Sequence, residues 1–151
     1  MGLFAAPLDG FSKEDFEVYN QACWSSNLHN LQRMKTKEKL LTLVKNVGKA
    51  LGIEGIEISS SSEIPSVWNG RQVKEQLVYY ARDGVRQKQL QSVIAREFDL
   101  AERIKSGAEH ERHLILFARI DAEHFTIGLR FTRFSLIDNR NLLARLEAEP
   151  D

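Results

Sequence analysis

Two runs of alternating apolar residues in the C-terminal third constrain the fold of this chain more than any other feature. The first run covers residues 113–120, the second covers residues 124–134, and residues 121–123 connect them. Alternation with a period of two indicates strands that bury one face, and a short polar connection between two such runs predicts a β-hairpin. Counting outward from the turn pairs Ile120 with Phe125. The chain is therefore expected to contain an antiparallel sheet.

Helical signals dominate the N-terminal third. Ser12 followed by Asp15 predicts a capping box, and Phe11 with Phe16 has the spacing of a hydrophobic staple. A longer helix is expected over residues 36–51, with Gly52 ending it. Its apolar residues recur at helical spacing and predict a buried stripe. The stripe consists of Leu40, Val44, Val47 and Leu51.

The remaining elements give the order αα-β-β-α-β-β-α. Strands are expected at residues 53–59 and 71–82, a third helix after Asp83, and a final helix that begins at Asp138. The inward-facing residues predicted for the last two helices are Val85, Leu90, Val93, Ile94 and Phe98, and Leu142, Leu143 and Leu146. This order predicts an α+β fold, in which helices cover an antiparallel or mixed sheet of about four strands.

Length and composition predict one domain over residues 1–151. The Ser-rich stretch 59–70 is expected to be a flexible loop within it. Cys23 is the only cysteine, which excludes an intrachain disulfide and suits a reducing compartment. The start of the chain has neither the basic region nor the apolar length of a signal peptide, and no apolar run is long enough to span a membrane. A cytoplasmic location without a membrane partner is expected.

Two short stretches resemble a family of uncharacterised bacterial proteins. Residues 11–18, FSKEDFEV, and residues 124–129, HFTIGL, look like the opening and a mid-chain strand of the YktB-like proteins. The basic, proline-containing segment that the family carries between these stretches is missing here. The resemblance implies a compact α+β fold, and it implies no activity and no site residues.

A polar side of the predicted sheet is the first candidate site. Arg119 and Arg130 lie on opposite strands of the hairpin, and the strand over residues 71–82 is expected to add Lys74, Tyr80 and Arg82. Guanidinium groups bind phosphate or carboxylate, and aromatic rings offer stacking surfaces. The same pattern also arises on an ordinary solvated sheet face, or where helices bury arginines against acidic partners.

A run of cations is the second candidate. Residues 28–49 contain six cations (Arg33, Lys35, Lys37, Lys39, Lys45 and Lys49) and a single acid, Glu38. Such a helix is suited to phosphate groups or an acidic partner, but the absence of a Gly-rich phosphate loop nearby favours a solvated helix face. The whole chain is neutral, with 21 cations and 21 acids, which argues against a protein built around nucleic acid.

Histidines and acids around the hairpin form the third candidate. His110, His113, Asp121 and His124 include an H-x-x-H spacing and are residue types that bind zinc. This spacing is also common by chance, so neither a metal site nor a cofactor is assigned. No phosphate-binding glycine loop, nucleophile elbow or C-x-x-C pattern is present, and no catalytic residue is assigned.

Three functions remain open at this point. The first is a binding or interaction module without catalysis, whose ligand is an anion, a nucleic acid or an acidic protein surface. The second is a small metal-dependent hydrolase that uses the histidines at 110–124. The third is a structural subunit that forms a homodimer.

Overall fold

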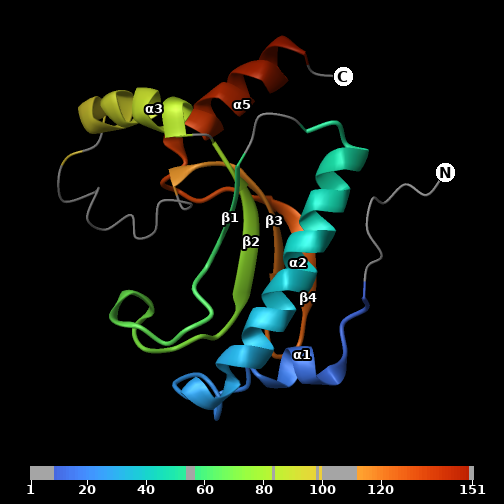
Figure 1. The fold of residues 1–151 in the computed structure, drawn as a ribbon. Coiled ribbons are helices and arrows are strands. Elements are labelled where there is room, and N and C mark those ends of the chain that lie inside the picture. The colour runs from blue at the N-terminus through green and yellow to red at the C-terminus, as the bar shows by residue number, and fades with distance from the viewer. Residues whose placement is uncertain (1–8, 54–56, 83, 98, 100–111, 150–151) are drawn as a thin grey trace. The chain divides into compact units, whose positions relative to one another are not determined.

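The computed structural model describes residues 9–53, 57–82, 84–97, 99 and 112–149, and it confirms the predicted α+β class (Figure 1). The described strands form one antiparallel sheet in the order β1-β2-β3-β4. These strands are β1 (Glu57–Ser60), β2 (Gln76–Ala81), β3 (Ile115–Ile120) and β4 (Phe125–Arg130). The described helices are α1 (Lys13–Glu17), α2 (Asn30–Ala50), α3 (Gly84–Glu97) and α5 (Leu136–Ala148), with short 3₁₀ turns η1 (Asn27–His29) and η2 (Val67–Asn69).

The chain divides into two compact units. Unit 1 comprises Met1–Tyr80 with Phe117–Gly128, and unit 2 comprises Ala81–Leu116 with Leu129–Asp151. No helix in the described part of the chain has the length and apolar character that a membrane span requires.

The predicted hairpin turn is present in unit 1. The backbone N–H of Asp121 donates to the carbonyl of His124 at 3.0 Å, which closes the turn between β3 and β4. The Asp121 carboxylate accepts the N–H groups of Glu123 at 2.9 Å and His124 at 2.8 Å. An aspartate that binds the backbone two residues ahead stabilises a tight turn. The local residue chemistry therefore sets this connection.

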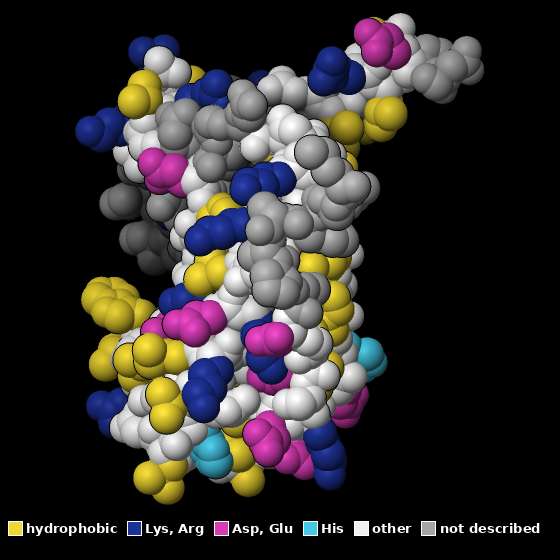
Figure 2. All heavy atoms as spheres, turned by 45° about the vertical axis from the view of Figure 1, so that its right-hand side comes forward, with side chains coloured by type: hydrophobic (Ala, Val, Ile, Leu, Met, Phe, Trp, Pro, Cys, Tyr) yellow, Lys and Arg dark blue, Asp and Glu magenta, His cyan; other side chains and the backbone are white. Residues whose placement is uncertain are grey.

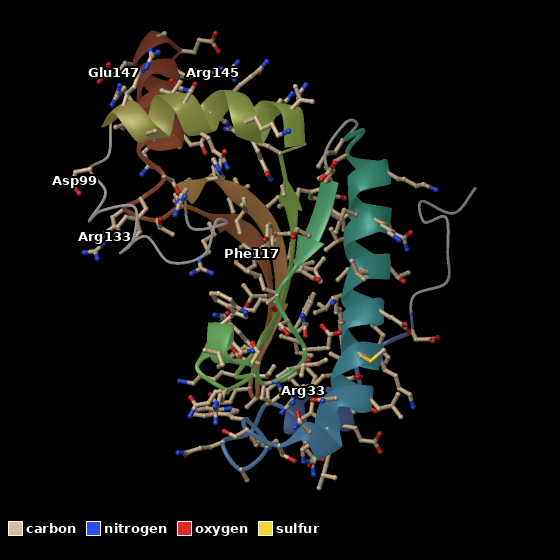
Figure 3. All side chains as sticks on the ribbon, turned by 60° about the vertical axis from the view of Figure 1, so that its left-hand side comes forward. Arg33, Asp99, Phe117, Arg133, Arg145 and Glu147 are labelled. Atoms are coloured by element: carbon tan, nitrogen blue, oxygen red, sulfur yellow. The ribbon has the colours of Figure 1, made fainter. Side chains whose placement is uncertain are left out.

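The pairing of β2 with β3 decides which side chains share a side of the sheet. Val78 lies opposite Ala118, and Leu77 lies opposite Arg119. Because directly paired residues point the same way, Val78 and Ala118 lie on one side and Leu77 and Arg119 on the other. We call the first the helix side, since α2 packs on it, and the second the far side. Figure 3 shows Phe117 on the far side.

The core of unit 1 lies between α2 and the helix side of the sheet. Leu40 and Val44 are buried on α2, and they share the core with Val78, Ala118 and Ile120. The hydroxyl of Tyr80 donates to the carbonyl of Val44 at 2.5 Å. Next to it, a Cβ atom on Gly48 would lie 1.8 Å from the Tyr80 hydroxyl oxygen, so only glycine permits this close approach.

Helix α2 is longer at its N-terminal end than its sequence predicts. It begins at Asn30 instead of residue 36, because the polar residues before it form a 3₁₀ turn that continues directly into the helix. The Ser26 side chain accepts the N–H of Leu28 at 3.2 Å, and η1 then leads into α2. Helix α1 is correspondingly short and ends at Glu17, so Cys23 lies in the turns after it.

The apolar stripe of α2 is buried at Leu40 and Val44 but not at its last position. Leu51 is 63% exposed, so the prediction that it is buried is wrong. Gly52 adopts φ +64° beyond the helix, its N–H donates to Lys49, and the N–H of Ile53 donates to Gly48. This arrangement is a Schellman ending, which turns the chain away from the core just where Leu51 lies.

Several other apolar residues expected in the core are exposed. They are Val85 and Val93 on α3, Phe125, Ile127 and Leu129 on β4, and Leu142, Leu143 and Leu146 on α5. Periodicity identifies an apolar side of a helix or strand but not whether another element covers it. In unit 1, β4 is the last strand of the described sheet, and the buried side chains of the sheet lie on β2 and β3. The predictions for Asp83, Phe98 and the Ile94 side chain lie outside the described residues.

Leu40 and Leu51 provide a matched test of where the core of unit 1 ends. We expect Leu40→Ala to lower the free energy of unfolding by about 2–5 kcal/mol, because Leu40 is fully buried. Leu51→Ala should change it by less than about 0.5 kcal/mol. Urea unfolding followed by circular dichroism measures both, and equal losses from the two variants would contradict this assignment of the core.

Candidate functional site

The pairing of β2 with β3 places two of the predicted anion-binding residues, Tyr80 and Arg119, on opposite sides of the sheet. Tyr80 points to the helix side, where it is buried against Val44, and Arg119 points to the far side. The expectation that they share a surface is wrong, because facing residues depend on a strand register that the sequence does not reveal. Lys74 precedes β2 and places its ammonium 4.8 Å from the centre of the Trp24 ring.

Arginines of the predicted surface already have acidic or other partners. The guanidinium of Arg119 lies 3.4 Å from Glu75 and 3.2 Å from Asp121. Burial alone raises the pKa of Asp121, but the N–H groups of the turn and the Arg119 charge lower it below its ordinary value. In unit 2, Arg82 pairs with Asp138, and the half-buried Arg130 has a partner of its own.

Two histidines of the predicted metal site lie beside acids. His113 is 3.8 Å from Asp138 in unit 2, and His124 is 3.7 Å from Asp121 and 3.9 Å from Glu123 in unit 1. His110 lies outside the described residues. Among the residues that the structure describes, no three His, Cys, Asp or Glu side chains are arranged to hold a metal ion.

The cations of residues 28–49 fall into two groups in the structure. Arg33 is buried, Lys37 pairs with Glu63 at 2.8 Å, and Lys39 pairs with Asp15 at 2.7 Å. The second group consists of Lys35, Lys45 and Lys49, which are all exposed. Three cations therefore hold the fold together, and three others lie on the solvent side of α2.

The buried Arg33 holds the segment between α1 and α2. Its guanidinium donates to the carbonyls of Cys23 at 2.5 Å, Ser26 at 3.1 Å and Val18 at 3.4 Å. Figure 3 shows Arg33 at the N-terminal end of α2, beside this segment. Burial lowers the pKa of Arg33, yet its ordinary value is so high that the group stays charged. The carbonyl oxygens partly replace the water that the charge has lost.

The buried Asp15 joins α1 to α2. Its carboxylate accepts hydrogen bonds from the Thr36 hydroxyl at 2.7 Å, the Gln32 amide at 3.2 Å and the Lys39 ammonium at 2.7 Å. It also accepts the Ser12 N–H at 2.8 Å, as the predicted capping box requires. Burial by itself raises the pKa of Asp15, but these donors outweigh it and hold the pKa below 3.8.

An exposed apolar surface lies where α2 meets the loop that carries η2. We call it the docking patch. It is formed by exposed residues of η1, α2 and the η2 loop: Leu28, Leu31, Met34, Ile64, Val67 and Trp68. Figure 2 shows hydrophobic side chains gathered at the lower left of that view. Trp68 is 96% exposed, the largest exposed fraction among these residues.

Direct contacts connect the two sides of the docking patch. The Lys37–Glu63 ion pair joins α2 to the η2 loop one turn beyond Met34. The N–H of Val73 donates to the carbonyl of Trp24 at 2.9 Å, and Lys74 lies over the Trp24 ring. The segment before α2 and the η2 loop are therefore neighbours within unit 1.

Internal hydrogen bonds give the η2 loop a defined shape. The Asn69 side chain accepts the N–H of Ser66 at 2.8 Å and donates to the carbonyl of Ile64 at 2.9 Å. Gly70 follows with φ +63°, and the N–H of Arg71 returns to the Ser66 carbonyl at 2.6 Å. The sequence predicts a flexible loop here, but a tryptophan inside a Ser-rich stretch, Trp68, is the signal of a surface that presents an apolar side chain.

A cavity of about 440 Å³ lies on another part of unit 1, beside α1. Its walls include Glu14, Glu17, Cys23, His29 and Gln32. Cys23, a free cysteine that is partly buried, lies on this wall.

Comparisons with protein-family models, with curated proteins and with solved structures find no match to this chain. The resemblance to YktB-like proteins stays a prediction.

Asp15 makes the stability of unit 1 depend on pH. Because the folded pKa lies below the ordinary value of 3.8, the ionised carboxylate stabilises the fold above that pH, and this contribution is lost as the pH falls through the lowered pKa. We expect Asp15→Asn to lower the free energy of unfolding by about 1.5–3 kcal/mol at pH 7. Urea unfolding from pH 7 down to acid should show this difference shrinking below the ordinary pKa. A constant difference over the whole range would contradict the role given to the Asp15 charge.

Proposed function

We propose that this chain is a protein-interaction module that binds a segment of another protein through the docking patch. The observation that carries the proposal is Trp68, which is 96% exposed on a hydrogen-bonded loop. Single exposed apolar residues are ordinary, but a group of them around a tryptophan is typical of a binding surface. Tryptophan is also among the residues that contribute most to binding free energy.

The shape of the patch favours binding because little ordering is left to occur. The η2 loop is held by Asn69 and by the ion pair of Glu63, and the start of α2 is held by Arg33. A surface that already has its bound shape loses less conformational entropy when a partner arrives. Apolar contact can then contribute directly to affinity.

The predicted sheet surface has less support as a binding site. Arg119 lies between two carboxylates, which offset its charge, and Tyr80 is buried. An anion at Arg119 would compete with Glu75 and Asp121, whereas a partner at the docking patch would displace only water.

Trp68→Ala tests the proposal, with Leu51→Ala as the matched control. Both residues are exposed apolar side chains of unit 1, but Leu51 lies 20 residues beyond Leu31, which places it near the opposite side of the helix. We expect the protein to select peptides from a random-peptide display library. Trp68→Ala should weaken binding of the selected peptides about 30-fold or more, with unfolding by urea unchanged.

Leu51→Ala should bind the same peptides as the parent does. If the parent selects no peptide above background, or if Trp68→Ala binds as tightly as the parent, the docking patch is not a binding surface.

A further inference from the structure

We infer that the partner of the docking patch is an acidic protein segment with apolar anchor residues, which lies along the solvent side of α2. This inference rests on the proposed function and adds the chemistry of the partner. The argument starts from the charges that the fold leaves outside. Asp15 and Glu63 each pair with a lysine of α2 that is partly buried. These two acids are therefore not available to neutralise the exposed lysines of α2, which are Lys35, Lys45 and Lys49.

The exposed cations continue the apolar part of the patch along one side of the helix. Five exposed residues of α2 are spaced by four, three, seven and four residues along the chain. They are Leu31, Lys35, Glu38, Lys45 and Lys49. Such intervals place all five on one side of an α-helix. Each of them is exposed. The distance from Leu31 to Lys49 is about 27 Å, which suits an extended or helical segment of a partner.

Two further cations lie on the loop side of the patch. Arg71 is exposed directly after η2, and Lys74 is exposed over the Trp24 ring. Glu38 is the exposed acid among these cations of α2 and the η2 loop. Glu63 also lies on the loop, but its charge is paired with Lys37. An apolar centre with a cationic border complements an acidic segment that carries apolar side chains.

A protein partner fits this chemistry better than a nucleic acid. Nucleic-acid surfaces bind bases on aromatic rings, and the docking patch has one aromatic ring among five aliphatic or thioether side chains. Leu28, Leu31 and Met34 would meet no complementary surface on a phosphate backbone. Against apolar side chains of a peptide, the same residues leave water on binding, which is favourable.

The composition of selected peptides tests the inference directly. A random-peptide display library panned on the protein should yield peptides with an excess of Asp and Glu and with apolar anchors. For one synthetic peptide of the selected sequence, we expect the affinity to fall as salt rises from about 50 to 500 mM, because exposed charges are screened. A peptide with its acids changed to Asn and Gln should bind more weakly.

Charge reversal on the protein provides the matched variants. Lys35→Glu combined with Lys45→Glu should weaken binding of the acidic peptide about tenfold. Lys13→Glu is the control, since Lys13 is an exposed cation on α1 that pairs with Glu17 and lies outside the patch. Glu38→Lys makes the opposite change at the centre of the cationic row and should strengthen binding. Urea unfolding of each variant checks that the fold is retained.

The outcomes separate failure of the inference from failure of the proposed function. Peptides that depend on Trp68 but carry no acidic excess, or that bind equally to the Lys35→Glu/Lys45→Glu variant and the parent, overturn the inference and leave the interaction module standing. Absence of any Trp68-dependent peptide overturns both. Tighter binding of an oligothymidine of about 20 nucleotides than of the peptide, lost in the lysine variant, identifies a nucleic-acid surface instead. Light scattering that shows a dimer of the parent and a monomer of Trp68→Ala identifies a second copy of this chain as the partner.

Discussion

The buried carboxylate of Asp15 determines how α2 is rotated about its own axis. A carboxylate without water needs donors for both of its oxygens, and Thr36 and Lys39 supply them from one side of α2. That side must therefore face α1. Leu31 and Lys35 border that side of the helix, toward solvent, and both are exposed. One internal charge thus decides which residues of α2 are available to a partner.

Two further contacts fix α2 at its ends. Arg33 binds the carbonyls of the segment after α1, and Gly48 lets the helix approach Tyr80 closely enough for the hydroxyl to reach Val44. Neither contact involves the docking patch. Together they hold the helix along its length, so the spacing between its apolar start and its exposed lysines does not depend on a partner.

Local signals in the sequence predicted local structure well. The capping box of Ser12 and Asp15 and the turn at Asp121 involve residues close together in the chain, and both are present. The orientation of Tyr80 and the exposure of Leu51 depend on which distant element lies opposite, and periodicity contains no information about that. The candidate site was missed for the same reason, because the η2 loop and the start of α2 come together only through the fold.

Ion pairs inside the fold also explain why overall composition is a poor guide to this surface. The chain is neutral, with 21 cations and 21 acids, and that balance argued against a protein built around nucleic acid. Pairing is not uniform, however, because Asp15 and Glu63 bind lysines on the sides of α2 that pack against other segments. Lysines on its outer side remain exposed around Glu38. Because screening limits exposed charges to neighbours within about 8 Å at physiological salt, a partner at the patch is attracted by this local excess and not by the neutral whole.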